Sequence, residues 1–250
     1  MKLLQLCVGM VRTNCYIVYD EATREAAVID PGDNAKSILH AVNEEQLNVK
    51  YVLLTHAHFD HILAAHEVLE ATGAQYVVPE KDTWLLSRDN MGQFRGLARN
   101  YVQDTPDILA NEGTEVTFGG MTATYMATPG HTPGSSVIRI GDCLFTGDTL
   151  WFGADGGYSF ISALAEDNKL AVKSLALLEK KLKKRGLHPL FITGHTGWTD
   201  NIEFAFAHKN ELCSPFKKRA HDPNALYDAY DESDDTEEKA KIGYLKGVGR

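Results

Sequence analysis

The sequence has no long apolar run and no excess of basic residues. None of its apolar stretches approaches the roughly 18 residues that a membrane-spanning helix needs, so we expect no membrane association. The chain carries 25 Lys and Arg residues against 34 Asp and Glu residues, which gives a formal net charge of −9. Proteins that bind nucleic acid usually have a basic patch. The composition therefore argues against a nucleic-acid partner.

Cysteine is scarce, and its spacing excludes a Cys-x-x-Cys pair. The four cysteines are Cys7, Cys15, Cys143 and Cys213. We interpret them as reduced structural thiols of a cytosolic protein. The N-terminus also lacks the apolar stretch of a signal peptide. We therefore expect the protein to be cytoplasmic.

Strand-like and helix-like segments alternate along the chain in two similar halves. Strands are expected at residues 3–8, 15–19, 26–29, 49–54, 76–78, 115–118, 121–127, 136–140, 143–146 and 190–193. Helices are expected at residues 34–45, 61–72, 168–185 and 200–212, and mixed helical pieces and loop at 80–112. This order predicts an α/β protein, an αββα sandwich of two mixed β-sheets flanked by helices.

The character of the sequence changes after Pro215. Residues 217–219 are basic, and residues 228–238 are acidic, with Tyr227 and Tyr230 in the same region. We expect one domain at residues 1–212 and an acidic C-terminal extension at residues 213–250. The extension is expected to pack on the body or on a partner subunit, which leaves a homodimer open.

Histidines and aspartates recur directly after short apolar runs, where loops at strand ends often carry functional groups. The set comprises His56, His58, Asp60, His61, His131, Asp148 and His195. Residues two apart in an extended segment point the same way. His56 and His58 can therefore reach one ion, completed by His131, while Asp60 and His61 turn toward a second, completed by His195. Asp148 has two carboxylate oxygens and can bridge. The pattern predicts a two-metal site.

Four motifs carry a resemblance over about residues 1–200, and the early Thr13-Asn14-Cys15-Tyr16 also fits. They are Thr55-His56-Ala57-His58-Phe59-Asp60-His61, Pro129-Gly130-His131-Thr132-Pro133-Gly134-Ser135, Phe145-Thr146-Gly147-Asp148-Thr149-Leu150 and Thr193-Gly194-His195-Thr196. The chain resembles the metallo-β-lactamase fold, in its hydroxyacylglutathione hydrolase (glyoxalase II)-like branch. The resemblance implies the same division of the seven ligands between two ions, with Asp148 as the bridge.

The implied reaction is metal-assisted hydrolysis of a small thioester or ester. A hydroxide held between the ions would be the nucleophile, because metals lower the pKa of bound water from about 15.7 toward about 7. Asp60 would orient that hydroxide as well as bind metal, so Asp60 and Asp148 are the predicted catalytic residues. We expect two divalent ions, zinc in the first place, although the same ligands suit Fe²⁺ and Mn²⁺.

The segment after Asp148 bears on the substrate, which we expect to be a small molecule. Glutathione thioesterases of this family carry a basic residue and an aromatic there, whereas residues 151–160 contain no Lys or Arg. Trp151, Phe152 and Tyr158 are the expected pocket residues, with core or lid packing as the equal alternative. A basic clamp would have to come from Lys217, Lys218 or Arg219.

Other functions of the same motifs stay open from the sequence. One is a mononuclear iron persulfide dioxygenase, although such relatives usually have an arginine in the loop after the bridging aspartate. Lactonase and phosphodiesterase activities would use the same ions. A non-catalytic metal-binding module is the third alternative, which the intact seven-ligand set disfavours.

Overall fold

The computed structural model describes residues 1–159, 165–212 and 242–244, and these form two compact units. The first unit contains Met1–Ala110, Val116–Thr122 and the strand at 242–244. The second contains Asn111–Glu115 and the described residues between Ala123 and Leu212.

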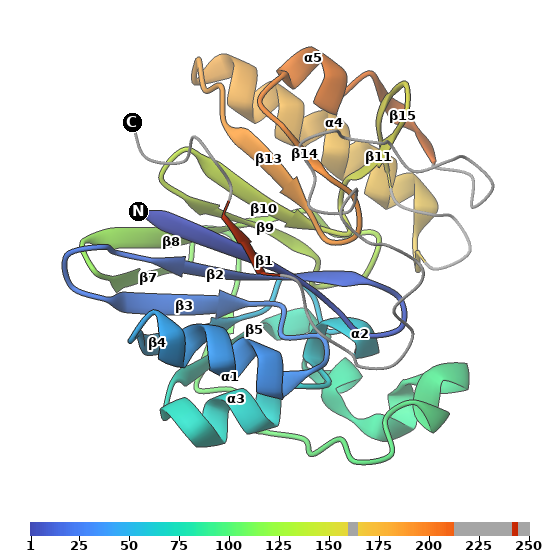
Figure 1. Ribbon diagram of the computed structural model, residues 1–250. Helices are drawn as coiled ribbons and strands as arrows, with labels where there is room; N and C mark the ends of the chain where they lie inside the picture. The colour runs from blue at the N-terminus through green and yellow to red at the C-terminus, as the bar shows by residue number, and fades with distance from the viewer. Residues whose placement is uncertain (160–164, 213–241, 245–250) are drawn as a thin grey trace, which may run out of the picture. The chain divides into compact units, whose positions relative to one another are not determined.

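A seven-stranded mixed sheet organises the first unit, in the order β16-β1-β2-β3-β4-β5-β6 (Figure 1). Its strands are β1 (Lys2–Val8), β2 (Thr13–Tyr19), β3 (Glu25–Ile29), β4 (Asn48–Leu53), β5 (Gln75–Pro79), β6 (Ile108–Ala110) and β16 (Ile242–Tyr244). β1, β2 and β3 pair antiparallel, and β3 to β6 run parallel. The carboxyl ends of β3, β4 and β5 therefore lie at one edge of this sheet.

Two helices, α1 (Ala35–Glu44) and α3 (Ala65–Thr72), lie side by side on this sheet (Figure 1). Asn34 caps α1 by accepting a hydrogen bond from the Ser37 N–H, and Ile38 and Val42 are on its buried face. These side chains join the buried faces of β1 to β5 in one apolar core. The helix predicted at residues 34–45 is confirmed.

The continuous helix predicted at residues 61–72 is wrong. The chain forms a short α2 (Phe59–Ile62) and then α3, with a break at Leu63 and Ala64. The Ala64 N–H donates to the Pro31 carbonyl at 3.0 Å, a bond that leaves the local helical pattern for a distant loop. Between β5 and β6 the chain forms three 3₁₀ turns, η1 (Glu80–Leu86), η2 (Arg88–Asn90) and η3 (Gly92–Gly96), as the mixed region predicted.

Most strands of the second unit belong to a sheet in the order β14-β13-β10-β9-β8-β7, of which most of β7 and the first two residues of β8 fall within Val116–Thr122 of the first unit. A three-stranded sheet in the order β11-β12-β15 lies within the second unit. The strands of the larger sheet are β7 (Glu115–Phe118), β8 (Met121–Ala127), β9 (Ser136–Ile140), β10 (Cys143–Gly147), β13 (Leu190–Thr193) and β14 (Trp198–Thr199). Those of the smaller sheet are β11 (Trp151–Gly153), β12 (Gly156–Ser159) and β15 (His208–Leu212). β10 and β13 are parallel neighbours, so their carboxyl ends lie together.

Helix α4 (Asn168–Lys184) covers the core of the second unit. Asp167 caps it by accepting from the Leu170 N–H, and Leu175, Leu178 and Leu182 are buried with residues of β10 and β13. Its lysines at 180, 181, 183 and 184 are exposed. The amphipathic helix predicted at residues 168–185 is confirmed.

The helix predicted at residues 200–212 is wrong over most of its length. A short α5 (Ile202–Ala205), capped by Asn201, is followed by β15, which pairs in parallel with β12. Pairing with a strand distant in the sequence outweighs local helix propensity here. Strands β11, β12 and β14 were also not predicted, because they are short and two of them contain glycine.

Most of the predicted C-terminal extension, residues 213–250, lies outside the described residues, as do Cys213, Lys217, Lys218 and Arg219. The described part, β16, pairs antiparallel with β1. The domain boundary at residue 212 stays a prediction. Cys7, Cys15 and Cys143 are free thiols. Among the helices that the structure describes, none combines the length and apolar character needed to cross a bilayer.

Candidate metal centre

Four of the predicted ligands follow β4 in the first unit. His56 and His58 precede α2, and Asp60 and His61 lie within it. The ring centroid of His56 is 4.9 Å from that of His58 and 4.1 Å from that of His61. His56 and His61 are buried, whereas His58 and Asp60 are partly exposed. Three imidazoles therefore gather after the carboxyl end of one strand, β4.

A buried carboxylate, Asp30, orients two of these rings. Its Oδ1 accepts from the Thr55 N–H at 2.8 Å, and its Oδ2 accepts from the Thr55 hydroxyl at 2.7 Å and lies 3.0 Å from His61 Nδ1. A carboxylate only accepts hydrogen bonds, so we infer that His61 Nδ1 carries the hydrogen. His61 Nε2 then presents a lone pair to a metal ion.

The same reasoning extends from Asp30 to His56 through Thr55. The Thr55 hydroxyl uses its hydrogen on Asp30, and its oxygen lies 3.1 Å from His56 Nδ1. That oxygen therefore accepts from His56 Nδ1–H, and His56 also presents Nε2 as a ligand. Both tautomers are those that metal ligation requires.

Asp60 is fixed by β2 and by the loop after β3. The Thr13 hydroxyl donates to Asp60 Oδ2 at 2.9 Å, and His61 Nε2 lies 3.6 Å from the same oxygen. A Cβ atom at Gly32 would lie 1.8 Å from the Asp60 carbonyl oxygen, so this close approach requires glycine. The Thr13 motif that resembles the family therefore supports the side chain of Asp60.

In the second unit, His131 lies in a loop held by the beginning of α4. The N–H groups of Asp167 and Glu166 donate to the carbonyls of Gly130 and His131 at 2.9 and 3.1 Å. Gly130 has φ +138°, and a Cβ there would lie 2.1 Å from the Ala171 nitrogen. Only glycine fits this position, which explains the Gly-His sequence before the loop turns.

Asp148 and His195 follow the parallel neighbours β10 and β13. Gly147 is in register with Thr193, and the Gly194 N–H donates to the Gly147 carbonyl at 2.9 Å. Asp148 Oδ2 lies 3.4 Å from the Nε2 atoms of both His131 and His195. One carboxylate oxygen thus lies between two imidazoles, as a bridging ligand requires.

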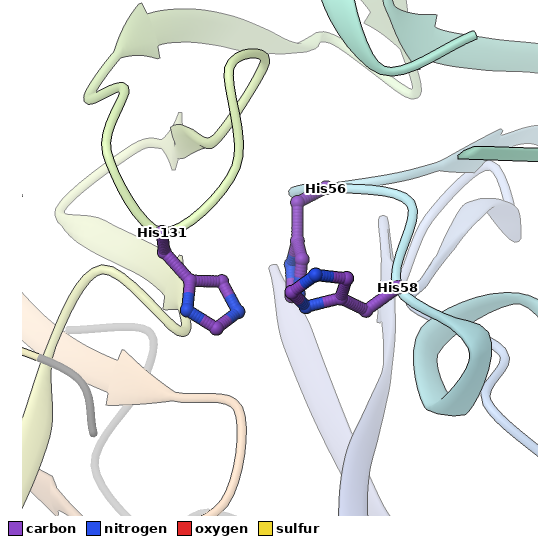
Figure 2. A group of neighbouring side chains, drawn as sticks. All are labelled: His56, His58 and His131. Atoms are coloured by element: carbon purple, nitrogen blue, oxygen red, sulfur yellow. The ribbon is translucent and has the colours of Figure 1, made fainter. Parts of the chain in front are cut away.

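The structure brings all seven predicted ligands into three groups, in each of which the ligand atoms lie within 4.8 Å of one another. The groups are His56, His58 and His131; His56, His61 and Asp148; and Asp60, His61 and His195. Figure 2 shows the first group, with His56 and His58 on the loop after β4 and His131 on the loop after β8. Imidazole and carboxylate donors in such groups fit divalent transition metals. Metal binding by these particular residues stays a prediction.

The three predicted pocket residues have different environments. The Trp151 ring centroid lies 6.1 Å from that of His195, next to a predicted ligand. Phe152 is buried in the second unit's apolar core and contacts Phe204, so core packing accounts for it. The Tyr158 hydroxyl donates to Asp155 at 2.8 Å, and its ring stacks on His208. Substrate contact by these residues stays a prediction.

Sequence reasoning missed two buried acids beside the ligand loop, Asp30 and Asp82. Both follow parallel strands, and the Asp82 Oδ2 accepts from the Ala57 N–H at 3.1 Å. An acid directly after an apolar strand, as in Ile29-Asp30, is the signal that could have indicated Asp30. Cys15 lies nearby; its burial and then the charge of Asp30 raise the pKa of its thiol well above the usual value. A buried thiol of this kind is far less reactive than an exposed one.

The family model of the metallo-beta-lactamase superfamily matches residues 8–216. The chain belongs to the metallo-beta-lactamase superfamily. Two curated relatives of this superfamily chain are informative. One is described as a probable metallo-hydrolase, YqgX, of Bacillus subtilis, with 30% identity over 80% of the chain and 92% of the relative. The other, the hydroxyacylglutathione hydrolase GloC of Haemophilus influenzae, is 35% identical over 59% of the chain and 71% of the relative.

Solved structures of the metallo-beta-lactamase superfamily agree. The B3 metallo-beta-lactamase BLEG-1 has a TM-score of 0.72 and 28% identity, over 83% of this chain and 97% of that one. ETHE1 from Myxococcus xanthus has a TM-score of 0.65 and 27% identity, over 84% and 83%. TTHA1623, solved in a di-iron-bound form, has a TM-score of 0.64 and 25% identity, over 84% and 98%.

These comparisons confirm the predicted fold class. The chain has the metallo-β-lactamase fold, an α/β fold with mixed sheets and helices. Members of the superfamily are usually hydrolases, and the fold binds divalent metals. Its narrower activity and the identity of its metal are matters for proposal.

Proposed function

We propose that the protein is a metal-dependent hydrolase of a small thioester or ester, similar to glyoxalase II. The position of Asp148 Oδ2, 3.4 Å from Nε2 of both His131 and His195, carries this proposal. A carboxylate in this position can bind two metal ions at once. Paired metal ions are typical of hydrolytic centres and not of purely structural metal sites. The 35% identity to GloC supports the thioester class.

Bound divalent ions would supply a water of lowered pKa and a Lewis acid for the substrate carbonyl. The residues of the chain have separate roles around that chemistry. Asp30 fixes the tautomers of His56 and His61, so that both present Nε2. Thr13 donates a hydrogen bond to Asp60, whose carboxylate would orient the attacking water. A thiolate leaving group needs little protonation, so no separate general acid is required.

The surroundings of His195 bear on the size of the substrate. Trp151 offers an apolar surface beside this ligand, and residues 151–159 contain no basic side chain. This arrangement supports a small apolar acyl group more than a specific clamp for the glutathione carboxylates. We also propose zinc as the metal, a small-molecule substrate without a nucleic-acid partner, and a cytoplasmic location.

The first experiment combines elemental analysis of protein purified without chelators with two thioester assays. S-lactoylglutathione and S-lactoyl-N-acetylcysteamine share the acyl group and differ in the thiol portion. Two zinc equivalents and turnover of both are expected. Turnover of the glutathione ester alone would indicate a glutathione-specific site. One iron per chain, with oxygen uptake on a persulfide, would instead favour the dioxygenase.

The variant Asp148→Ala tests the two-metal assignment directly. It should lose metal and lower kcat/KM by roughly 1,000-fold or more, since metals contribute several kcal/mol to the transition state. The matched control is His188→Ala, an exposed histidine outside the three ligand groups. Full activity in the aspartate variant would refute the proposal.

A further inference from the structure

The loop that carries His56, His58 and Asp60 alternates these ligands with Ala57 and Phe59. Both intervening residues contact the segment that connects β5 to β6. We define the bracing segment as residues 80–96, which contain η1, η2 and η3. Its contacts lie within the first unit.

The first contact is a hydrogen bond to the backbone between two ligands. Asp82, on η1, is fully buried, and its Oδ2 accepts from the Ala57 N–H at 3.1 Å. Hydrogen bonds to a charged acceptor are stronger than those between neutral groups. Burying a carboxylate costs free energy unless the group is hydrogen-bonded. The hydrogen bond from the Ala57 N–H therefore accounts for an acid at the buried position of Asp82. This bond fixes the peptide plane that separates His56 from His58.

The second contact is an aromatic stack on the other intervening residue. The rings of Phe59 and Phe94 lie 4.4 Å apart at their centroids with an interplanar angle of 13°. Phe94 belongs to η3, and Phe59 packs against the apolar core of the first unit. Such a pair contributes more to stability than its buried area alone. The stack restrains the backbone that separates His58 from Asp60.

The bracing segment is itself anchored and can therefore transmit restraint. Leu85, Leu86 and Met91 are buried in the first unit's core. Just beyond it, Asp104 pairs with His66 of α3 at 3.1 Å. A supporting segment that is itself buried and paired keeps a ligand side chain in one orientation, whereas a mobile segment would move together with the ligand.

We infer that Asp82 and Phe94 are positioning residues for His58, acting through Ala57 and Phe59. The inference rests on the proposed metal site. His58 stands between the two braced backbone positions, and among the ligands before Phe59 it is the more exposed. Loss of either brace should let His58 rotate away from the group that it forms with His56 and His131. The ion of that group should then bind less tightly, while the ion near Asp60, His61 and His195 is retained.

The test is competition between a zinc chelator and the full-length holoprotein. The variants are Asp82→Ala, Asp82→Asn, Phe94→Ala and Phe94→Leu. The alanine variants should lose one zinc equivalent at a chelator concentration roughly 10-fold to 100-fold lower than wild type needs, because supporting groups contribute that much to metal affinity. Asp82→Asn keeps an acceptor oxygen and Phe94→Leu keeps bulk, so both should recover most of the affinity.

The control is Trp84→Ala, which removes a 47% exposed aromatic from the same 3₁₀ turn as Asp82. It should titrate as wild type does. Equal zinc affinity in wild type, Asp82→Ala and Phe94→Ala would overturn the inference. If Asp82→Ala does not fold, Phe94→Ala alone decides between these results. Absence of any bound divalent metal from the wild-type protein would instead refute the proposed function, so the two failures are distinguishable.

Discussion

Asp30 links the fold of the first unit to the chemistry proposed for it. Its two oxygens serve the Thr55 backbone, the Thr55 hydroxyl and His61 Nδ1. An amide in its place keeps only one acceptor oxygen, and when that oxygen accepts from the Thr55 N–H, its NH₂ group faces the Thr55 hydroxyl and His61 Nδ1. His61 would then be pushed to the other tautomer, with the hydrogen on Nε2.

Asp30→Asn should therefore weaken binding of one metal ion by roughly 10-fold to 100-fold while the fold is retained. Zinc titration with chelator competition measures the loss, and circular dichroism monitors the fold. Asp142→Asn, at an exposed turn position, is the matched control for the lost charge. Unchanged zinc affinity in Asp30→Asn would show that the tautomer is set by another group.

At the scale of elements, the sequence predicted those with strong periodicity and missed those set by distant partners. The strand before His56 and helix α4 could be predicted, because a continuous apolar run and an amphipathic repeat are local signals. The break at Ala64 depends on the Pro31 carbonyl, and β15 depends on β12, so neither has a local signal.

The residues of the site also fall into those that the sequence predicted and those that it missed. Its ligands were predictable because their spacing is regular and each follows a strand. Asp30 and Asp82 were not predicted, because their contacts with the ligand loop cross 25 or more positions of sequence. Burial of Phe152 in the core could not be separated from pocket lining by sequence alone.

The pair His66 and Asp104 connects α3 to the chain before β6 and should make stability depend on pH. The hydrogen bond to Asp104 raises the pKa of His66, with burial opposing and the charges of Asp104, Glu70 and Glu67 adding to the rise. A raised folded-state pKa stabilises the fold below the unfolded value of about 6.5, and this stabilisation is lost as pH rises through the raised pKa.

The melting temperature of Asp104→Asn should therefore fall below that of wild type most clearly under about pH 6.5. The two melting curves should converge at alkaline pH. Asp89→Asn removes a carboxylate that pairs with the guanidinium of Arg95 instead of with a histidine, and should show no such convergence. A pH-independent difference for Asp104→Asn would contradict the assignment.

At the scale of the whole molecule, bound metal should contribute to the free energy of unfolding. Free zinc at 100 times its dissociation constant stabilises a folded protein by about 2.7 kcal/mol through mass action. For a chain of this size, that corresponds to about 5–10 °C in Tm. Chelation should lower Tm by this amount, and added zinc should restore it.

Calorimetry with and without chelator makes this measurement, and Asp148→Ala serves as its control. The variant should melt at one temperature in both conditions, because it lacks the shared ligand. A wild-type Tm that does not respond to chelation or added zinc would argue against tight metal binding.

The parallel pairing of β10 with β13 has a consequence for how such a protein can diversify. Asp148 and His195 are held at a fixed separation by backbone hydrogen bonds between these two strands. The hairpin of β11 and β12 and the helix α4 come between them in the chain. Insertions or replacements in that intervening stretch can change which substrate binds, while the distance between Asp148 and His195 stays the same.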